Sequence, residues 1–300
     1  MDNRNDIREF LTSRRERLTP EQAGLPNFGG RRRVKGLRRE EVALLAGMST
    51  EYYVRLERGN GAGVSEAVLN GISRALQLDE AEHAHLYDLV RAGNQGAEPS
   101  RRRGPSRPQH VRPSVQQLID TMIDVPVFIQ NGRLDAVATN RLGAALFSEM
   151  FVMPQRPVNA ARFILLDPRA QTFYRDWESN ARQIVALLRA EAGRSPYDRL
   201  LTDLVGELAT RSDLFRSLWA SHDVRVHRNG SKNLHHPVVG DLDLTFEAMD
   251  LTSDPGLQLL AFTAAPGTAS HDGLHLLGTW AATTHIDTTR LPANDTSATP

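Results

Sequence analysis

A segment rich in proline, glycine and arginine at residues 93–113 divides this chain into two parts. It reads GNQGAEPSRRRGPSRPQHVRP, with four Pro, three Gly and five Arg and no regular spacing of apolar side chains. Such a segment cannot bury enough apolar surface to fold alone, so it predicts a linker. We expect a domain over 1–93, the linker over 94–113, a second domain over 114–282 and a disordered tail over 283–300, which is rich in Thr, Ala, Asp and Pro.

The net charge of zero hides an uneven distribution along the 300 residues. Residues 1–113 hold 20 Lys and Arg against 15 Asp and Glu, a net charge of +5. Residues 114–300 hold 16 against 21, a net charge of −5. Within residues 14–39, nine basic side chains stand against two acidic ones. A basic excess confined to one part of a chain is typical of a region that meets nucleic acid.

Composition excludes several classes of protein. Hydrophobic residues make up 40% and charged residues 24%, which favours a folded chain over a disordered polyampholyte. The chain has no cysteine, which excludes a disulfide framework, a thiolate metal site, a cysteine nucleophile and a thiol redox switch. The N-terminal MDNRNDIREFLTSRRER lacks the apolar core of a signal peptide, and no stretch reaches about 18 apolar residues. We expect a cytoplasmic protein without membrane insertion.

The first part of the chain predicts an all-α domain of five helices. Ile7, Phe10, Leu11 and Arg14 follow helical spacing. A long basic loop, broken by prolines and glycines, comes next. Two short helices are expected within residues 37–59, and two more over 65–76 and 79–92, each opened by a residue suited to capping.

The most informative stretch is residues 37–59, LRREEVALLAGMSTEYYVRLERG. Gly47 is expected to end the first of two short helices, and Ser49 to cap the second. Small Ala43 allows the helices to approach closely, and the predicted apolar seam consists of Val42, Met48, Tyr53 and Leu56. This pattern predicts a helix-turn-helix, whose second helix enters the major groove of DNA. A plain helical hairpin is the alternative interpretation.

Six side chains of this motif are candidates for contacts with DNA. Thr50, Glu51 and Arg55 are expected on the outward face, where Arg suits guanine, Glu suits the cytosine amino group and the Thr methyl suits thymine. Phosphate contacts, which position the protein without reading sequence, are expected from Arg39, Ser49 and Arg58. The Arg run of the linker is a further phosphate candidate, although a solvated linker is the favoured interpretation.

The motif closely resembles the helix-turn-helix regulators of the xenobiotic-response-element (XRE) type, and GRRRVKGLRREEVALLAG is typical of an actinobacterial branch of that family. The residues that carry the resemblance are Leu37, Glu40, Val42, Ala43, 46–49, Tyr52, Tyr53, 56–59, Leu69 and Leu76. That family opens its first motif helix with a Gln that contacts phosphate. Arg39 stands at this position, and the resemblance implies that the contact persists with a stronger charge.

The second part of the chain predicts an α+β domain with an antiparallel sheet and helices on one side of it. Helices are expected over 114–123, 141–151, 171–192, 197–210 and 214–220. Strands are expected over 127–130 and up to Thr139, with an Asn131–Gly132 turn between them. Alternation after Asp223, an Asn229–Gly230 turn, a strand to Val239, the apolar positions 242, 244, 246 and 248, and a strand over 257–264 predict further hairpins.

Nearly all of this part resembles the ligand-binding domain of MmyB-like regulators, which has a PAS-like fold. The resemblance is carried by residues 161–178, 185–196, 204–225 and 236–249. It implies an apolar, acyl-chain ligand between sheet and helices, and the candidate lining residues are Phe128, Asn140, Phe147, Phe163, Tyr174, Trp177 and Phe246. Ordinary core packing is the alternative for each, and Tyr174 and Asn140 could also hold a polar head group. The family usually has Trp where this chain has Thr139, which implies a roomier pocket.

Enzyme chemistry finds little support in the sequence. His222, His227, His235 and His236 suggest a metal site, but their spacing does not converge, and adjacent strand residues such as His235 and His236 point to opposite faces. There is no Gly-x-Ser-x-Gly elbow, and GNGAG at 59–63 lacks the Lys of a phosphate-binding loop. We expect no catalytic residues, no metal and no cofactor other than a bound fatty acid acting as effector.

Taken together, the sequence predicts a transcription regulator that binds a double-stranded DNA operator as a homodimer. Two-fold protein symmetry matches pseudo-palindromic operators. A small apolar ligand would act by changing the spacing of the two DNA-binding domains, which requires different ligand affinities for the two arrangements. Two alternatives stay open at this point: a regulatory module that binds a protein partner, and an enzyme using His227 or His236 with a DNA-binding appendage.

Overall fold

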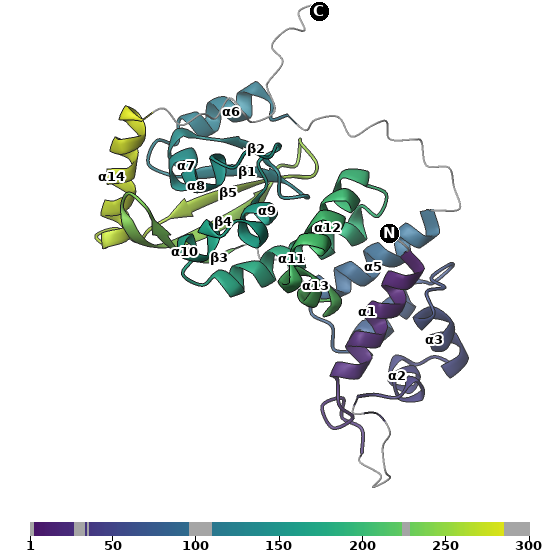
Figure 1. Cartoon of the computed structure of the whole chain (residues 1–300). Helices are drawn as coiled ribbons and strands as arrows, with labels where there is room; N and C mark the ends of the chain where they lie inside the picture. Colours follow the sequence, from purple (N-terminus) through teal and green to yellow (C-terminus); the bar gives the residue numbers. More distant parts are fainter. Residues whose placement is uncertain (1–2, 27–33, 35, 96–109, 224–228, 285–300) are drawn as a thin grey trace, which may run out of the picture. The chain divides into compact units, whose positions relative to one another are not determined.

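The computed structural model describes residues 3–26, 34, 36–95, 110–223 and 229–284 (Figure 1). Contacts divide the chain into two compact units. Unit 1 comprises Met1–Gly104 together with Arg189–Thr202 and Ser217–Val226; unit 2 comprises Pro105–Leu188, Asp203–Arg216 and His227–Pro300. The units are therefore not continuous in sequence. The linker boundaries stay a prediction, because most of that segment lies outside the described residues.

Five helices open unit 1, as the sequence predicts: α1 (Asn3–Arg17), α2 (Arg39–Ala46), α3 (Thr50–Glu57), α4 (Glu66–Ala75) and α5 (Glu80–Gln95). Ser49 accepts a hydrogen bond from the backbone N–H of Tyr52, and Ser65 accepts one from Val68, so both predicted N-caps are confirmed. Gly47 ends α2 at φ +71°, a left-handed conformation that favours glycine.

The core of unit 1 joins these helices. Val42, Ala43, Tyr53 and Leu56 are buried in it and Met48 is partly buried, which confirms the predicted seam between α2 and α3. The same cluster contains residues of α1, α4 and α5 and also Ala190, from the 189–202 segment. A residue far along the chain is thus part of the hydrophobic core that supports the helix-turn-helix.

Unit 2 is built on a five-stranded antiparallel sheet, which confirms the predicted fold class. The strands are β1 (Val127–Asn131), β2 (Ala136–Thr139), β3 (Asn229–His236), β4 (Gly240–Asp250) and β5 (Leu257–Thr263). Their order across the sheet is β2-β1-β5-β4-β3. Leu242, Leu244 and Phe246 are buried while the residues between them are exposed, the alternation expected of a strand that is covered on one face.

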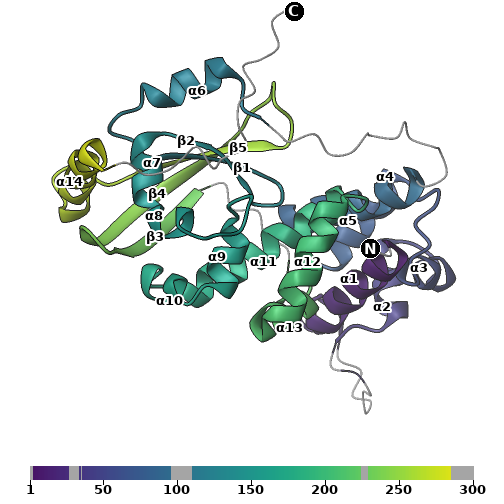
Figure 2. The same cartoon turned by 45° about the horizontal axis from the view of Figure 1, so that its top comes forward.

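Helices cover both faces of this sheet, so the prediction of helices on one side only is wrong. On one face, α6 (Pro113–Asp120) packs through Val115 and Ile119 against β1 and β5. On the other face lie α7 (Arg141–Leu146), α8 (Ser148–Phe151), α10 (Arg169–Phe173) and α14 (Ala269–Thr283), and Figure 2 shows α6 and α7 on opposite sides. The reason lies in β1. All five of its residues are buried, so other elements must pack against both faces of this strand.

Three predicted elements are wrong in detail. The predicted helix 141–151 breaks at Phe147 into α7 and α8. The predicted helix 171–192 is interrupted between α10 and α11 (Trp177–Arg194), because the backbone of Tyr174 bridges to Leu234 and that of Arg175 donates to Asn233, both on β3. Pairing with a distant strand replaces the local helical hydrogen bonds there.

The third error is the predicted turn at Asn229–Gly230. Both residues lie within β3, paired with Glu247 and Phe246 of β4. The chain reverses instead after His236, three residues before the predicted strand end at Val239, and Gly240 adopts φ +74° there. The eight residue pairs between β3 and β4 stabilise the strand by more than the Asn-Gly pair favours a turn.

The remaining helices are α9 (Ala160–Leu166), α12 (Arg199–Arg211), α13 (Asp213–Ala220) and α14 (Ala269–Thr283). The helices α12 and α13 lie close to the predicted helices 197–210 and 214–220, whereas α9 and α14 were not predicted. Thr268 caps it by accepting from His271, and Leu274 and Leu277 are buried. The predicted tail begins at its last residue, and residues 285–300 lie outside the described ranges.

Candidate DNA interface and ligand-binding region

The outward face of α3 carries the three predicted base-reading side chains. Thr50, Glu51 and Arg55 are exposed, while Tyr53 and Leu56 are buried on the opposite side. Thr50, Glu51 and Arg55 line one surface hollow together with Val54, Arg58 and Asn60. The structure therefore brings the three predicted base readers and one predicted phosphate contact, Arg58, to a single surface.

The other two predicted phosphate contacts are more constrained. The Ser49 hydroxyl accepts the N–H of Tyr52 as the cap of α3, and can still donate its own hydrogen. Arg39 is 52% exposed, but its Nε also forms an ion pair with Glu57. That hydrogen bond raises the pKa of Arg39, so the guanidinium is permanently charged and is held against α3.

Glu57 joins the helices that carry the predicted DNA contacts, a role that was not predicted from the sequence. Its side chain is 1% exposed and joins three helices: it pairs with Arg15 Nε of α1 at 2.6 Å and with Arg39 of α2, and it accepts from the Tyr53 hydroxyl at 3.4 Å. Arg15 also donates to the carbonyl of Leu37 at 3.1 Å. The signal was the Glu of the LERG stretch, four residues after the buried Tyr53 and so on the same helix face.

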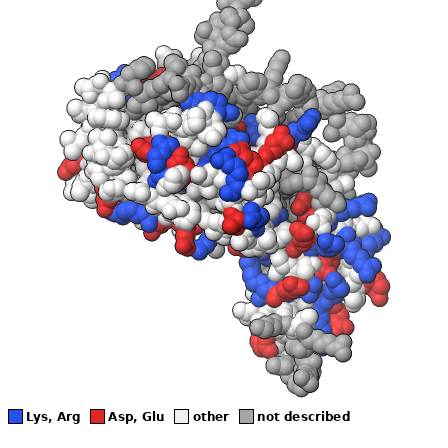
Figure 3. All heavy atoms as spheres, viewed as in Figure 1, with Lys and Arg blue, Asp and Glu red and all other residues white. Residues whose placement is uncertain are grey.

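Charges of both signs are mixed on the surface of unit 1. In Figure 3, basic side chains gather over the α1–α3 region with acidic ones between them. Phosphate attraction to such a surface is local to the Arg side chains, because neighbouring carboxylates weaken the long-range field.

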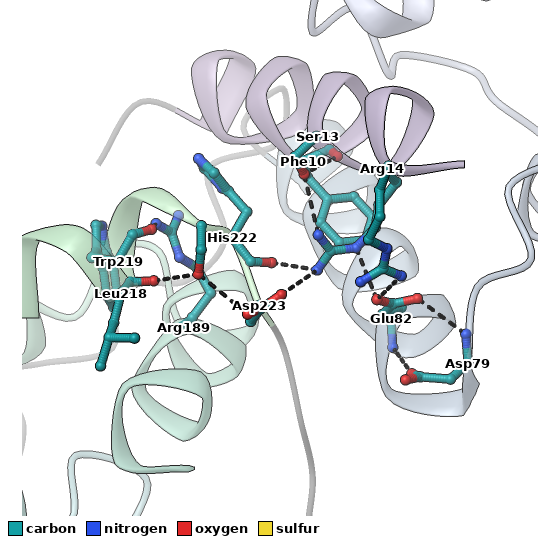
Figure 4. Close-up of polar contacts among 12 residues, drawn as sticks. Phe10, Ser13, Arg14, Asp79, Glu82, Arg189, Leu218, Trp219, His222 and Asp223 are labelled. Atoms are coloured by element: carbon teal, nitrogen blue, oxygen red, sulfur yellow. Dashed lines mark hydrogen bonds and ion pairs between the residues drawn. The ribbon is translucent and has the colours of Figure 1, made fainter. Parts of the chain in front are cut away.

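A buried charge cluster lies where residues 189–202 and the described residues 217–223 meet α1 and α5 within unit 1 (Figure 4). Arg14 of α1 is buried, pairs through Nε with Glu82 of α5 at 2.9 Å and donates to the carbonyl of His222. Its guanidinium also lies 4.9 Å from the centre of the Phe10 ring and 4.0 Å from Asp223. One arginine therefore connects three segments of unit 1.

A second arginine, Arg189, lies in the same cluster. Its guanidinium stacks over Trp219 at 4.0 Å from the ring centre and donates to the carbonyl of the same residue. Burial lowers the pKa of Arg189 to about 10, which leaves it charged at neutral pH. The stack holds the 189–202 and 217–226 segments to each other.

Two histidines in this cluster are held neutral. Burial, with the charges of Arg189 and Arg14, lowers the pKa of His85 to about 3 and that of His222 to about 4. His85 packs edge-on against Phe10 at 5.1 Å, and its Nδ1 has no hydrogen-bond partner among the described residues. His222 Nε2 lies 3.1 Å from Glu9.

In unit 2, five of the seven predicted ligand-binding residues belong to one aromatic cluster. Phe128, Phe147, Phe163, Tyr174 and Phe246 are all buried. They are linked through two rings that were not predicted, Phe173 and Phe262, with centroid distances of 5.0–6.3 Å: Phe128–Phe147, Phe147–Phe173, Phe147–Phe262, Phe163–Phe173, Phe173–Tyr174 and Phe246–Phe262. The cluster lies on the sheet face covered by α7 and α10. It offers apolar surface, and burial raises the pKa of Tyr174, which keeps that hydroxyl neutral.

The other two predicted residues have structural partners. The Asn140 oxygen caps α7 by accepting from Gly143 and also accepts from Val127, and its amide nitrogen donates to the carbonyls of Ile119, Met122 and Val125. The Trp177 ring is half-buried, and its Nε1 donates to the carbonyl of Ile164 at 2.8 Å. With its amide so occupied, Asn140 positions α7 and is poorly suited to hold a head group.

Unit 2 also has a groove of about 1370 Å³ between α6, α7 and α14. Thr139, Asn140, Leu142, His271 and His275 are among its lining residues. Of the seven predicted ligand-binding residues, all of them within the described ranges, Asn140 alone lines it. Thr139 donates to the carbonyl of Val127 at 2.7 Å, so the residue that replaces the family's Trp is a groove wall tied to β1.

The histidine cluster is dispersed. His235 is exposed and its Nδ1 lies 2.6 Å from Asp241, whereas His236 is buried and its Nε2 contacts the carbonyl of Ala145 at 3.0 Å. The two point to opposite faces of β3, as predicted, and His227 lies outside the described residues. Within the described part of the chain, no three His, Asp or Glu side chains are grouped so that they could hold a metal ion.

Comparison with known proteins gives two family matches. Residues 6–86 match a helix-turn-helix domain, and residues 111–277 match the MmyB-like transcription regulator ligand binding domain. No curated protein matches the chain. Within the described ranges, no helix combines the length and apolar character needed to cross a membrane. Because the second match covers more than half of the 300 residues, the chain belongs to the MmyB-like transcription regulators, with a DNA-binding domain followed by a ligand-sensing one.

Proposed function

We propose that this regulator binds a specific operator as a homodimer through α3, and that an acyl-chain ligand in unit 2 controls the binding. The observation that carries the DNA-binding part is the common surface of Thr50, Glu51, Arg55 and Arg58. A helix presenting a guanidinium, a carboxylate and a methyl group has the donor, acceptor and apolar groups that base edges in the major groove require.

The ligand-binding part rests on the aromatic cluster of unit 2. Its rings supply a large apolar surface on the face of the sheet beneath α7 and α10. Because the rings contact one another, a ligand chain enters by separating them, and it must be apolar to replace the contacts it removes. A fatty-acid-like chain meets that requirement.

Control of DNA binding by the ligand is supported by the composition of unit 1. The ligand-binding family match at 111–277 includes the 189–202 and 217–226 segments, yet contacts place both segments in the unit that carries the helix-turn-helix. Ala190 lies in the core of that unit, and Arg14 donates to the carbonyl of His222. A ligand that prefers one arrangement of α11 would therefore bias the surroundings of α1 and α5.

Selection of bound DNA from a random pool, using the full chain, tests the DNA-binding proposal. We expect enrichment of a pseudo-palindrome and a protein dimer on the selected site, measured by native mass spectrometry. The Arg55→Ala variant should lose the preference for one base position, while Arg91→Ala, which removes an exposed charge from α5, should not. A pool without enriched sequence, or a monomer on an asymmetric site, would contradict the proposal.

A further inference from the structure

Lys232 occupies an unusual position for a lysine. It lies on β3 opposite Leu244 of β4, on the same sheet face as the buried Leu234, Leu242 and Phe246. Residues at alternate positions, such as Ser231, are exposed on the other face. The side chain of Lys232 is therefore directed to the face that carries the aromatic cluster.

The contacts of the Lys232 ammonium are all neutral. Nζ donates to Oδ1 of Asn180 and to Oε1 of Gln183 at 2.8 Å, both on α11, and lies 5.4 Å from the centre of the Phe246 ring. An ammonium group has three hydrogens, and two amide oxygens accept two of them. No Asp or Glu side chain in the described ranges forms an ion pair with it, in contrast to the buried Arg14 and Arg15, which pair with Glu82 and Glu57.

A buried charge without a counter-ion is unfavourable. Burial accordingly lowers the pKa of Lys232 to about 8, and no neighbouring carboxylate raises it again. At neutral pH the group still carries most of its charge. A half-buried cation that uses two of its three N–H groups within the described part of the chain is complementary to a single negative charge, whereas a dianionic phosphate would require further cations.

The surroundings of Lys232 are complementary to an apolar chain, so that the site as a whole suits an amphipathic molecule. From Phe246 the rings continue to Phe262 at 6.1 Å, then to Phe147 at 5.1 Å and Phe128 at 5.7 Å. The Lys232 ammonium group therefore lies at one end of a row of aromatic rings on the same sheet face.

We propose that Lys232, with Asn180 and Gln183, forms the head-group site of unit 2 and binds the carboxylate of a monocarboxylic acyl ligand whose chain lies along the aromatic row. This rests on the acyl ligand of the proposed function and replaces Tyr174 and Asn140 as head-group candidates. An uncharged alcohol of the same chain length would share the apolar contacts and lack the ion pair.

The full chain titrated with decanoate and with 1-decanol tests this site. Decanoate should bind at least tenfold more tightly than 1-decanol at pH 7, and Lys232→Met should reduce decanoate binding about tenfold while leaving 1-decanol unchanged. Lys232→Met removes a half-buried charge that has no ion pair among the described residues and should fold at least as stably as the wild type, checked by thermal unfolding. Decanoate binding unchanged in a folded Lys232→Met variant would overturn the site and leave the acyl ligand standing.

A direct readout is available because Lys35 and Lys232 are the only lysines in the chain. With ¹³C-lysine labelling, the Cε resonance assigned through Lys35→Arg reports the Lys232 titration. Decanoate should raise its midpoint by one pH unit or more, and 1-decanol should not. An unmoved midpoint in the presence of bound decanoate would overturn the site. Binding of neither compound would overturn the acyl ligand and this head-group site together.

Discussion

Two of the three arginines predicted to contact DNA, Arg39 and Arg55, differ in the partners of their guanidinium groups. Arg55 is exposed and lines the hollow at α3, so its guanidinium is available to a base edge. Arg39 pairs with the buried Glu57 and keeps about half of its side chain exposed. Although Arg39 and Arg55 carry the same charge, their substitution is therefore expected to have different effects.

Arg55→Ala should weaken binding to the selected operator by about 1–3 kcal/mol, concentrated at one base position. The reason is that a guanidinium reading guanine discriminates among bases, while a phosphate contact does not. Affinity measured against single-base variants of the operator checks this. Equal weakening on every sequence would make Arg55 a phosphate contact instead.

Arg39→Ala should weaken binding to all sequences similarly and reduce the slope of log affinity against log salt by about one. Because Arg39 also neutralises Glu57, the same substitution should lower the stability of unit 1, an effect that Arg58→Ala should not share. Affinity at several salt concentrations, with unfolding measured on both variants, separates the two roles. An Arg39→Ala variant that is as stable as the wild type and has an unchanged salt slope would contradict both the phosphate contact and the stabilising role of Arg39.

Glu57→Gln should destabilise unit 1 by about 3–5 kcal/mol, because it removes the buried carboxylate that lies 2.6 Å from Arg15 and leaves that guanidinium only the exposed Glu16 at 3.8 Å among the described carboxylates. The exposed Glu80→Gln on α5 serves as the control and should change stability by less than about 0.5 kcal/mol. Urea unfolding of both variants provides the comparison. If Glu57→Gln lowered the free energy of unfolding no more than the control does, the Arg15–Glu57 ion pair would make no net contribution to stability.

At the scale of elements, the C-terminal end of α11 packs closely against α5 within unit 1. A Cβ atom at Gly193 would lie 2.6 Å from the ring of His85 on α5, a distance at which the ring or the backbone must shift. At Gly206 on α12 a Cβ would meet nothing within 4 Å. The two helical glycines thus form a matched pair of tests.

Gly193→Ala should destabilise unit 1 by about 1–3 kcal/mol through this overlap. Gly206→Ala should instead stabilise the chain by about 0.5–1 kcal/mol, because alanine loses less backbone entropy in a helix. Thermal unfolding of the two variants checks the opposite signs. A neutral or stabilising Gly193→Ala would show that α11 does not pack closely against His85.

For the whole molecule, the buried histidines predict a loss of stability in mild acid. Both pKa values lie below the value of about 6.5 for an unfolded histidine. The unfolded chain therefore binds protons first as pH falls through 6.5, and stability is lost from there towards pH 3–4. Between pH 6.5 and 5, before most carboxylates titrate, stability should fall by about 1–3 kcal/mol.

Urea unfolding at pH 6.5, 6.0, 5.5 and 5.0 measures this slope. His85→Leu should reduce the slope, since leucine fills the space without a proton site. The control Tyr87→Phe changes a half-buried ring on the same helix whose pKa is raised above 10, so it should leave the slope over this pH range as it is. A wild-type stability that stays constant or rises over this range would contradict the neutral state of His85 and His222.

The features that could be predicted from the sequence are those that depend on local chemistry. The caps at Ser49 and Ser65, the left-handed Gly47 and the alternation along β4 follow from groups within a few residues of one another, and all are confirmed. The break before α11, the strand at Asn229 and the burial of Glu57 arise only in the folded chain, as do the contacts of Lys232 with α11. These depend on backbone pairing and desolvation between residues far apart in sequence, where distant partners outweigh local propensity.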